Sequence, residues 1–236
     1  MRIAVSSSTF RRPLAAAELT QLEWLERCAS QLGADGVLAD IVDFPRRDAE
    51  YVAQLRKVAI DLGLVPFGLD AAGLLDPGAA LDEILGIAAG FGAAIIRTAL
   101  PAPGDVPPAA FAAAVAAGKA LGRAAKDANV TVVVGAAPGT LGADLGSIKR
   151  LLKDVDSAWL RSCPPALVDP AEVATKDRFP AVAATPGDDP QAVVERAARG
   201  WVILDAPTAE APWGALAQAV GRLREAEARH WLATST

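Results

Sequence analysis

Histidine is nearly absent from this chain of 236 residues, which contains one histidine, two cysteines, one methionine and one tyrosine. With His230 as the only imidazole, mechanisms that need two are excluded, including zinc hydrolysis by an H-E-x-x-H motif. Cys28 and Cys163 show no regular spacing. This excludes a disulfide scaffold and a cysteine-type zinc site.

Long apolar runs and an excess of positive charge are also lacking. The longest apolar stretch, Ile84–Ile96, is too short to span a bilayer and is interrupted by glycines. The first residues lack the apolar core of a signal peptide, so we expect a cytoplasmic protein with no membrane partner. A net charge of -5 and a pI near 5.0 argue against nucleic-acid binding.

What the sequence does contain is a regular alternation of short apolar runs and longer amphipathic segments. The predicted strands are Arg2–Ser7, Gly36–Asp40, Leu64–Asp70, Ala93–Thr98, Val130–Gly135, Ala158–Cys163, Ala181–Thr185 and Trp201–Asp205. The predicted helices are Leu19–Leu32, Asp48–Leu62, Ala79–Ala89, Pro108–Lys126, Ala143–Lys153, Pro170–Ala174, Pro190–Arg199 and Trp213–Leu232. Eight such units, with a period of roughly 30 residues, predict an α/β fold: one compact (β/α)8 TIM barrel over residues 1–236, with short later units.

A doubly wound open sheet is the competing architecture. It would normally carry a glycine-rich phosphate-binding turn after the first strand. The turn here reads Ser6-Ser7-Ser8-Thr9-Phe10 and contains no glycine. The closed barrel is therefore favoured.

Charged side chains stand where the predicted strands end, which is where the active sites of (β/α)8 barrels lie. Arg97 and Arg161 each follow an apolar strand, where a charge is costly to bury unless it is paired. Asp40 and Asp205, also on even-numbered strands, are their expected partners. Two interpretations stay open: a structural salt-bridge network, or an anion clamp for a phosphate or carboxylate.

The anion-clamp hypothesis assigns a role to each polar residue at this end. Ser6 and Asp70, at the ends of the first and third strands, join the two arginines as ligand-binding candidates. Asp205 is the first candidate for a catalytic base and Asp40 the second. Asp70 is weaker as a base, because Gly68 and Gly73 nearby are typical of a residue that shapes a turn.

Several stretches resemble the sugar phosphate isomerase/epimerase family of xylose isomerase-like TIM barrels. Leu22–Ala29 (LEWLERCA) and Leu32–Val37 (LGADGV) are similar to the family's first helix and second strand. The other similar stretches are Tyr51–Ala59 with Leu62–Leu64, Asn129–Val134, Pro138–Thr140 and Val155–Arg161. The resemblance implies a TIM barrel with a divalent metal bound by Glu, Asp, His and Glu at the ends of the later strands.

The chain departs from the family at those metal-ligand positions. Gly135, Ala136 and Ala137 stand where the fifth strand of the family ends in Glu-Asn-His. Cys163 and the two prolines after it replace the expected aspartate, and Asp205 is a shortened stand-in for the last glutamate. One carboxylate cannot hold a hard dication that wants several oxygen ligands. We therefore predict no metal, no cofactor and no Lewis-acid route to an enediolate.

Two hypotheses about function remain. The first is a metal-independent isomerase or epimerase that binds a small anionic or polyhydroxylated, sugar-like molecule. The second is a catalytically inactive binding or assembly subunit. A homo-oligomer formed through the outer helices is compatible with both, since TIM barrels often associate in this way.

Overall fold

The strands form one parallel sheet that curls into a nearly closed barrel. The computed structural model describes residues 1–167, 180–197, 200–206 and 212–234. The strands are β1 (Arg2–Ser6), β2 (Gly36–Asp40), β3 (Val65–Asp70), β4 (Ile95–Thr98), β5 (Thr131–Gly135), β6 (Leu160–Cys163), β7 (Ala181–Ala184) and β8 (Trp201–Leu204). They lie in the order β6-β5-β4-β3-β2-β1-β8-β7, and every ladder is parallel.

The barrel closes between β6 and β7, just beyond the end of β6. The backbone amide of Ala183 donates to the carbonyl oxygen of Pro164 at 2.9 Å, and the amide of Ala166 donates to the carbonyl of Ala183 at 2.7 Å. With this seam the predicted (β/α)8 barrel is confirmed.

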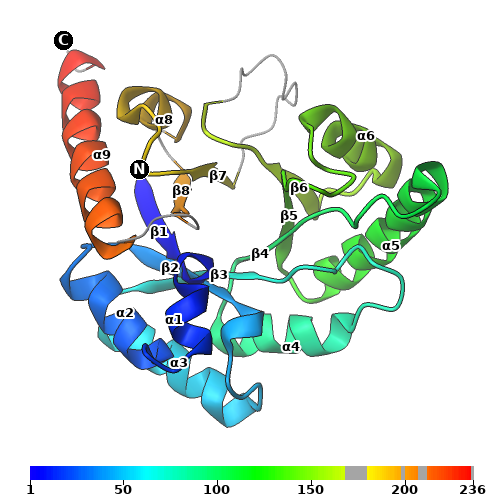
Figure 1. Ribbon diagram of the computed structural model, residues 1–236, viewed down its shortest axis with the longest axis horizontal. Helices are drawn as coiled ribbons and strands as arrows, with labels where there is room; N and C mark the ends of the chain where they lie inside the picture. The colour runs from blue at the N-terminus through cyan, green and yellow to red at the C-terminus, as the bar shows by residue number, and fades with distance from the viewer. Residues whose placement is uncertain (168–179, 198–199, 207–211, 235–236) are drawn as a thin grey trace.

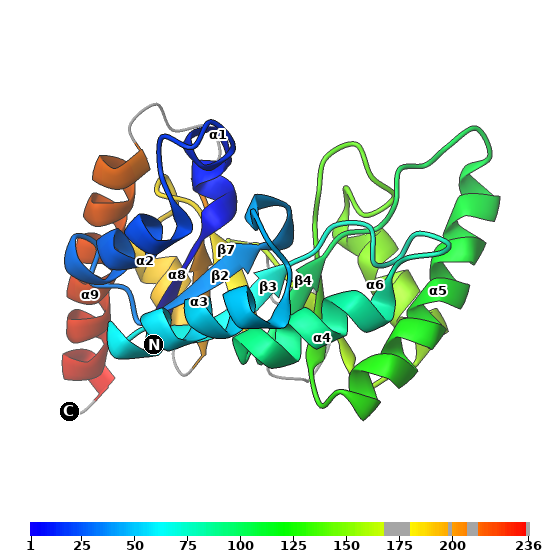
Figure 2. The same ribbon diagram turned by 90° about the horizontal axis from the view of Figure 1, so that it is seen from below.

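The long helices form an outer ring around the strands (Figure 1). They are α2 (Gln21–Ser30), α3 (Ala49–Asp61), α4 (Leu81–Phe91), α5 (Pro107–Asp127), α6 (Leu145–Val155), α8 (Pro190–Ala197) and α9 (Pro212–Thr234). From below, α3 and α4 run past β2 and β3 (Figure 2). Within the described residues, no helix combines the length and the apolar character needed to cross a membrane.

The bounds of these strands and long helices agree with the predicted ones to within two residues. Three short helices were not predicted: η1 (Ser7–Phe10), α1 (Arg11–Ala15) and η2 (Ile41–Asp43). The helix predicted at Pro170–Ala174 lies outside the described residues.

Local sequence signals explain where the helices begin and end. Thr20 and Glu23 form a capping box at the start of α2: the Glu23 amide donates to Thr20 Oγ1 at 3.2 Å, and the Thr20 amide donates to Glu23 Oε2 at 2.8 Å. Gly92 ends α4 with a φ of 82°, a left-handed conformation that glycine adopts without strain.

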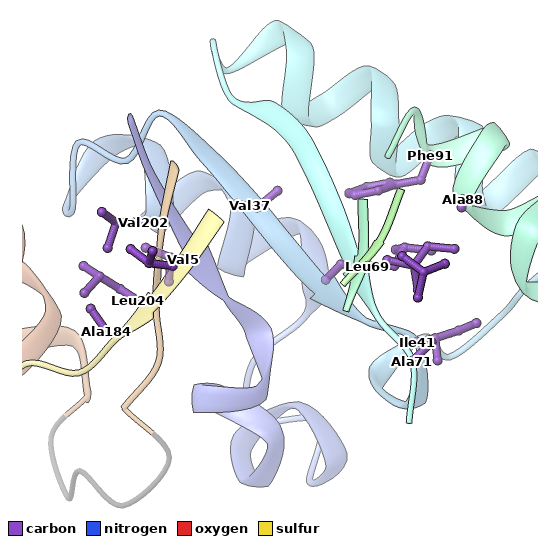
Figure 3. Packing of buried hydrophobic residues seen from close by; sticks show 14 of the residues in the cluster. Val5, Val37, Ile41, Leu69, Ala71, Ala88, Phe91, Ala184, Val202 and Leu204 are labelled. Atoms are coloured by element: carbon purple, nitrogen blue, oxygen red, sulfur yellow. The ribbon is translucent and has the colours of Figure 1, made fainter. Parts of the chain in front are cut away.

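Buried apolar side chains form two layers. The larger layer lies between the sheet and the helices; Figure 3 shows Leu69 of β3 near Ala88 and Phe91 of α4 within it. The smaller layer fills the barrel and takes one buried residue from each strand: Ala4, Leu38, Phe67, Ile95, Val133, Cys163, Ala181 and Ile203. The filled interior leaves room for a ligand only at the ends of the strands.

Candidate functional site

A cavity of about 350 Å³ opens where the strands end. Its polar lining residues are Ser8, Arg11, Asp40, Asp70, Arg97, Thr98 and Asp205. The rest of its lining is small and mostly apolar: Ala71, Ala72, Ala99, Gly135, Ala136, Ala137, Cys163, Pro165 and Ala183. The volume is at the lower end of the range of about 300–1,000 Å³ that is typical of small-molecule sites.

Arg97 is the central charge of this cavity. It leaves β4 and reaches across the barrel to Asp205, which follows β8 on the opposite wall. Its Nε and Nη2 donate to the two oxygens of Asp70 at 2.5 and 2.6 Å, an arrangement in which both partners use two atoms. Nη1 donates to Asp205 Oδ2, and Nη2 also donates to Asp205 Oδ1 at 3.2 Å. One guanidinium therefore joins two carboxylates at the ends of two strands, β3 and β8, that are not neighbours in the sheet.

Serines of β1 and the turn after it connect these carboxylates. Ser6 Oγ donates to Asp70 Oδ2 at 3.0 Å and lies 2.8 Å from Ser8 Oγ. Ser8 Oγ in turn donates to Asp205 Oδ1 at 3.1 Å. The serine run fits this task because a hydroxyl both donates and accepts.

Burial makes the charges of this cluster interdependent. The side chains of Arg97, Asp70 and Asp205 are 15%, 12% and 18% exposed. Burial raises the pKa of the Asp70 carboxyl, while the Arg97 guanidinium opposes that rise. The two carboxylates raise the pKa of Arg97 further above its ordinary value, against the effect of burial, so the arginine stays charged. The cluster holds one more negative charge than positive when both aspartates are ionised.

Asp40 belongs to a second ion pair, at the rim. Arg11 Nη2 donates to Asp40 Oδ2, and the arginine side chain is 57% exposed. The same carboxylate accepts from the amide of Val42 at 3.1 Å, which fixes its orientation. Close by, burial raises the pKa of Asp43 to about 6, although Ser7 Oγ donates to this carboxylate at 2.9 Å.

The structure brings five of the six predicted site residues together: Ser6, Asp40, Asp70, Arg97 and Asp205. Asp40, Asp70, Arg97 and Asp205 line the cavity, and Ser6 lies buried beneath it. The expected pairing of Arg97 with Asp205 is present. Its other carboxylate partner is Asp70, whereas Asp40 pairs with Arg11.

Arg161, the sixth predicted site residue, neither lines the cavity nor joins the hydrogen-bonded cluster beside it. Its Nε donates to the carbonyl oxygen of Ala158 at 3.0 Å, before the start of β6. Ladder register aligns Arg97 with Val133 and Val133 with Arg161. Because barrel strands tilt, aligned residues shift along the barrel axis from one strand to the next. The residue of β6 that reaches the cavity is Cys163, two positions later.

The sequence prediction did not assign Ser8, Thr98 or Arg11 to the site, and Arg11 is the charged residue among these three. It reaches Asp40 because η1 and α1 turn the chain back over the barrel end directly after β1. A signal for this turn exists: Ser6 caps η1, accepting from the Ser8 amide at 3.3 Å, and serine runs are typical N-caps.

The lining residues do not fit the divalent metal that the family resemblance implies. Gly135, Ala136, Ala137 and Cys163 surround the cavity and offer no side-chain oxygen. The carboxylate of Asp205 already accepts from Arg97. Among the described residues, no group of three or more His, Cys, Asp and Glu side chains is arranged to hold a metal ion.

Comparisons with known proteins show which fold this is. No family model matches the chain, and no curated protein matches its sequence. Three solved structures illustrate the likeness.

The probable 3-DHS dehydratase AsbF from Bacillus anthracis has a TM-score of 0.72 and 13% identity, over 93% of this chain and 97% of that chain. The 3-keto-D-glucoside 4-epimerase YcjR from E. coli has a TM-score of 0.73 and 15% identity, over 95% of this chain and 99% of that chain.

A xylose isomerase-like TIM barrel protein from Mycobacterium smegmatis, in complex with magnesium, has a TM-score of 0.67 and 13% identity, over 96% of this chain and 95% of that chain. At these identities the likenesses establish the fold: this chain is built like the xylose isomerase-like TIM barrels.

Proposed function

We propose that this barrel binds a small, neutral, polyhydroxylated molecule in its carboxyl-end cavity without a divalent metal. The observation that carries the proposal is Arg97, whose guanidinium lies between Asp70 and Asp205 and hydrogen-bonds to both. Ser8, Arg11 and Asp40 add donors and acceptors on the same side of the cavity. Closely spaced donors and acceptors of this kind suit the hydroxyl groups of a sugar-sized ligand.

Charge argues against an anionic ligand. Asp70 and Asp205 satisfy the Arg97 guanidinium and leave an excess of one negative charge in the buried cluster. A phosphate or carboxylate in the cavity would meet these aspartates at short range, where like charges in a partly buried site repel strongly. Arg11 is neutralised by Asp40 and mostly exposed, so it adds little attraction.

Proton transfer on the bound molecule is a second candidate function. It is favoured by two carboxylates on one guanidinium, of which Asp70 is the more deeply buried and has a raised pKa. Asp205 lines the cavity and is the first candidate for the base. The epimerase among the structural neighbours supports this reading by analogy of fold. A catalytically inactive binding or assembly subunit is the alternative.

The cellular setting belongs to the same proposal. We propose a cytoplasmic protein without nucleic-acid or membrane partners; the net charge of -5 argues against a nucleic-acid partner. Homo-oligomer formation through the outer helices is compatible with this setting.

Thermal-shift and calorimetric titrations test the proposal. The panel comprises neutral monosaccharides and polyols, sugar phosphates and carboxylates, each measured with EDTA and with added magnesium or manganese. Neutral members should stabilise the protein equally in both conditions, and Asp205→Asn should weaken the response. Asp61→Asn is the control, because Asp61 is 58% exposed on α3, far from the lining residues.

Two outcomes would contradict the proposal: stabilisation by the anions alone, or binding that EDTA abolishes. For the second candidate, the bound molecule is incubated with the protein in D₂O. Deuterium entering a C–H bond next to a carbonyl indicates proton transfer, and its absence together with tight binding indicates the inactive alternative.

A further inference from the structure

The cavity has a charged wall and an apolar wall, and the separation follows the order of the strands. The charged wall comes from β8, β1, β2 and β3, which are consecutive in the sheet and supply Asp205, Ser8, Asp40 and Asp70. Arg97 starts on β4 but extends to this wall through its bonds to Asp70 and Asp205. The ionic groups are therefore concentrated on one side.

The side chains in the described part of the opposite wall offer only carbon and sulfur. This wall comes from β5, β6 and β7, of which the last two meet at the seam of the barrel, with Gly135 to Ala137, Cys163, Pro165 and Ala183. Burial raises the pKa of the Cys163 thiol to about 12, so this residue acts as a small neutral group. Ala183 uses its backbone amide and carbonyl in the β6–β7 seam and presents a half-buried methyl group next to the filled interior.

We infer that the ligand is a single ring with its hydroxyl groups along one edge and an apolar edge opposite, as in a deoxy sugar. This inference rests on the proposed function. A ring hydroxyl directed at the alanine wall would lose its hydrogen bonds to water and find no side-chain partner among the described residues there. A methyl or methylene at the same position would bury apolar surface instead. A cavity of about 350 Å³ limits the ligand to about one ring.

Pairs of sugars that differ by one hydroxyl provide the test. D-galactose is compared with D-fucose, its 6-deoxy form, and L-mannose with L-rhamnose, each titrated by calorimetry. In the pair whose ring stereochemistry fits, the deoxy member should bind at least about tenfold more tightly. Ala183→Ser places a hydroxyl on the apolar wall and should abolish most of that preference. Ala53→Ser, on the exposed surface of α3, should leave it unchanged.

Carbon-13 labelling of the alanine methyl groups gives an independent readout. The deoxy sugar should shift the NMR signals of Ala137 and Ala183 and leave that of Ala53 in place. Equal affinity within every pair, or loss of the deoxy preference in Ala53→Ser as much as in Ala183→Ser, would overturn the inference and leave the proposed function standing. Failure of every neutral sugar and polyol to bind would overturn the proposed function as well.

Discussion

Replacing Arg97 by methionine should be far more damaging than neutralising either of its aspartate partners. Arg97 is 15% exposed and joins two carboxylates that are 12% and 18% exposed. Methionine preserves much of the length but removes the charge and the donors. Asp70 and Asp205 are then left as two like charges without a cation. Breaking a buried pair in this way costs about 3–5 kcal/mol.

The opposite substitution changes the charge balance favourably. Asp205→Asn keeps the shape and an acceptor oxygen for Arg97, and it removes the excess negative charge from the cluster. The loss of one charge-assisted hydrogen bond is partly offset, so the expected cost is at most about 1 kcal/mol. The two variants therefore differ by several kcal/mol although both lose the ion pair between Arg97 and Asp205.

Urea denaturation at pH 7, with thermal melting in parallel, measures this difference. For a chain of this size the Arg97→Met cost corresponds to a fall in Tm of about 6–20 °C. The double variant Arg97→Met/Asp70→Asn should recover part of the lost stability, because only one unpaired carboxylate remains. If the single variant Arg97→Met does not fold, the double variant is measured in its place. An Arg97→Met cost below about 1 kcal/mol, or an equal cost for Asp205→Asn, would refute the reasoning.

Three further predictions concern the surroundings of the site. Burial raises the pKa of Asp43 from 3.8 to about 6, so the wild type keeps its full stability below pH 4 and loses part of it as the pH rises through 6. The variant Asp43→Asn should therefore be about 1 kcal/mol more stable than the wild type at pH 8, after allowance for solvent screening, and equally stable at pH 4. Urea titrations at the two pH values measure this difference. Gly68→Ala would place a Cβ 2.6 Å from Ile95 Cγ1, and the overpacking should lower the free energy of unfolding by about 1–3 kcal/mol; an unchanged Tm would contradict this. Arg11→Ala should cost about 1–3 kcal/mol, because it leaves the Asp40 side chain, which is 7% exposed, without its cation; a cost below about 0.5 kcal/mol in the same assay would contradict this.

The fold could be predicted because its signals are local and repeated. The secondary structure of an apolar run such as Gly36–Asp40, or of a capped helix such as Gln21–Ser30, can be predicted from that segment alone. Eight repeats of the strand–helix unit then indicate a barrel. The positions of Ser6, Asp40, Asp70 and Asp205 at the strand ends follow from the bounds of those strands, which the sequence predicts.

Apart from the pair of Arg97 with Asp205, the pairing of the charges could not be predicted in the same way. The position of Arg161 depends on strand tilt, which shifts aligned residues along the axis and has no signature in one strand's sequence. Arg11 pairs with Asp40 through a short helix, α1, of five residues, too short to show helical periodicity.

A crystal structure grown with a neutral sugar and millimolar manganese, with data collected at the manganese absorption edge, tests the central claim most directly. The account predicts sugar density against Asp205 and Arg97 and no anomalous peak in the cavity. A manganese ion at about 2.2 Å from a carboxylate oxygen of Asp205, with the Arg97 guanidinium displaced, would contradict it.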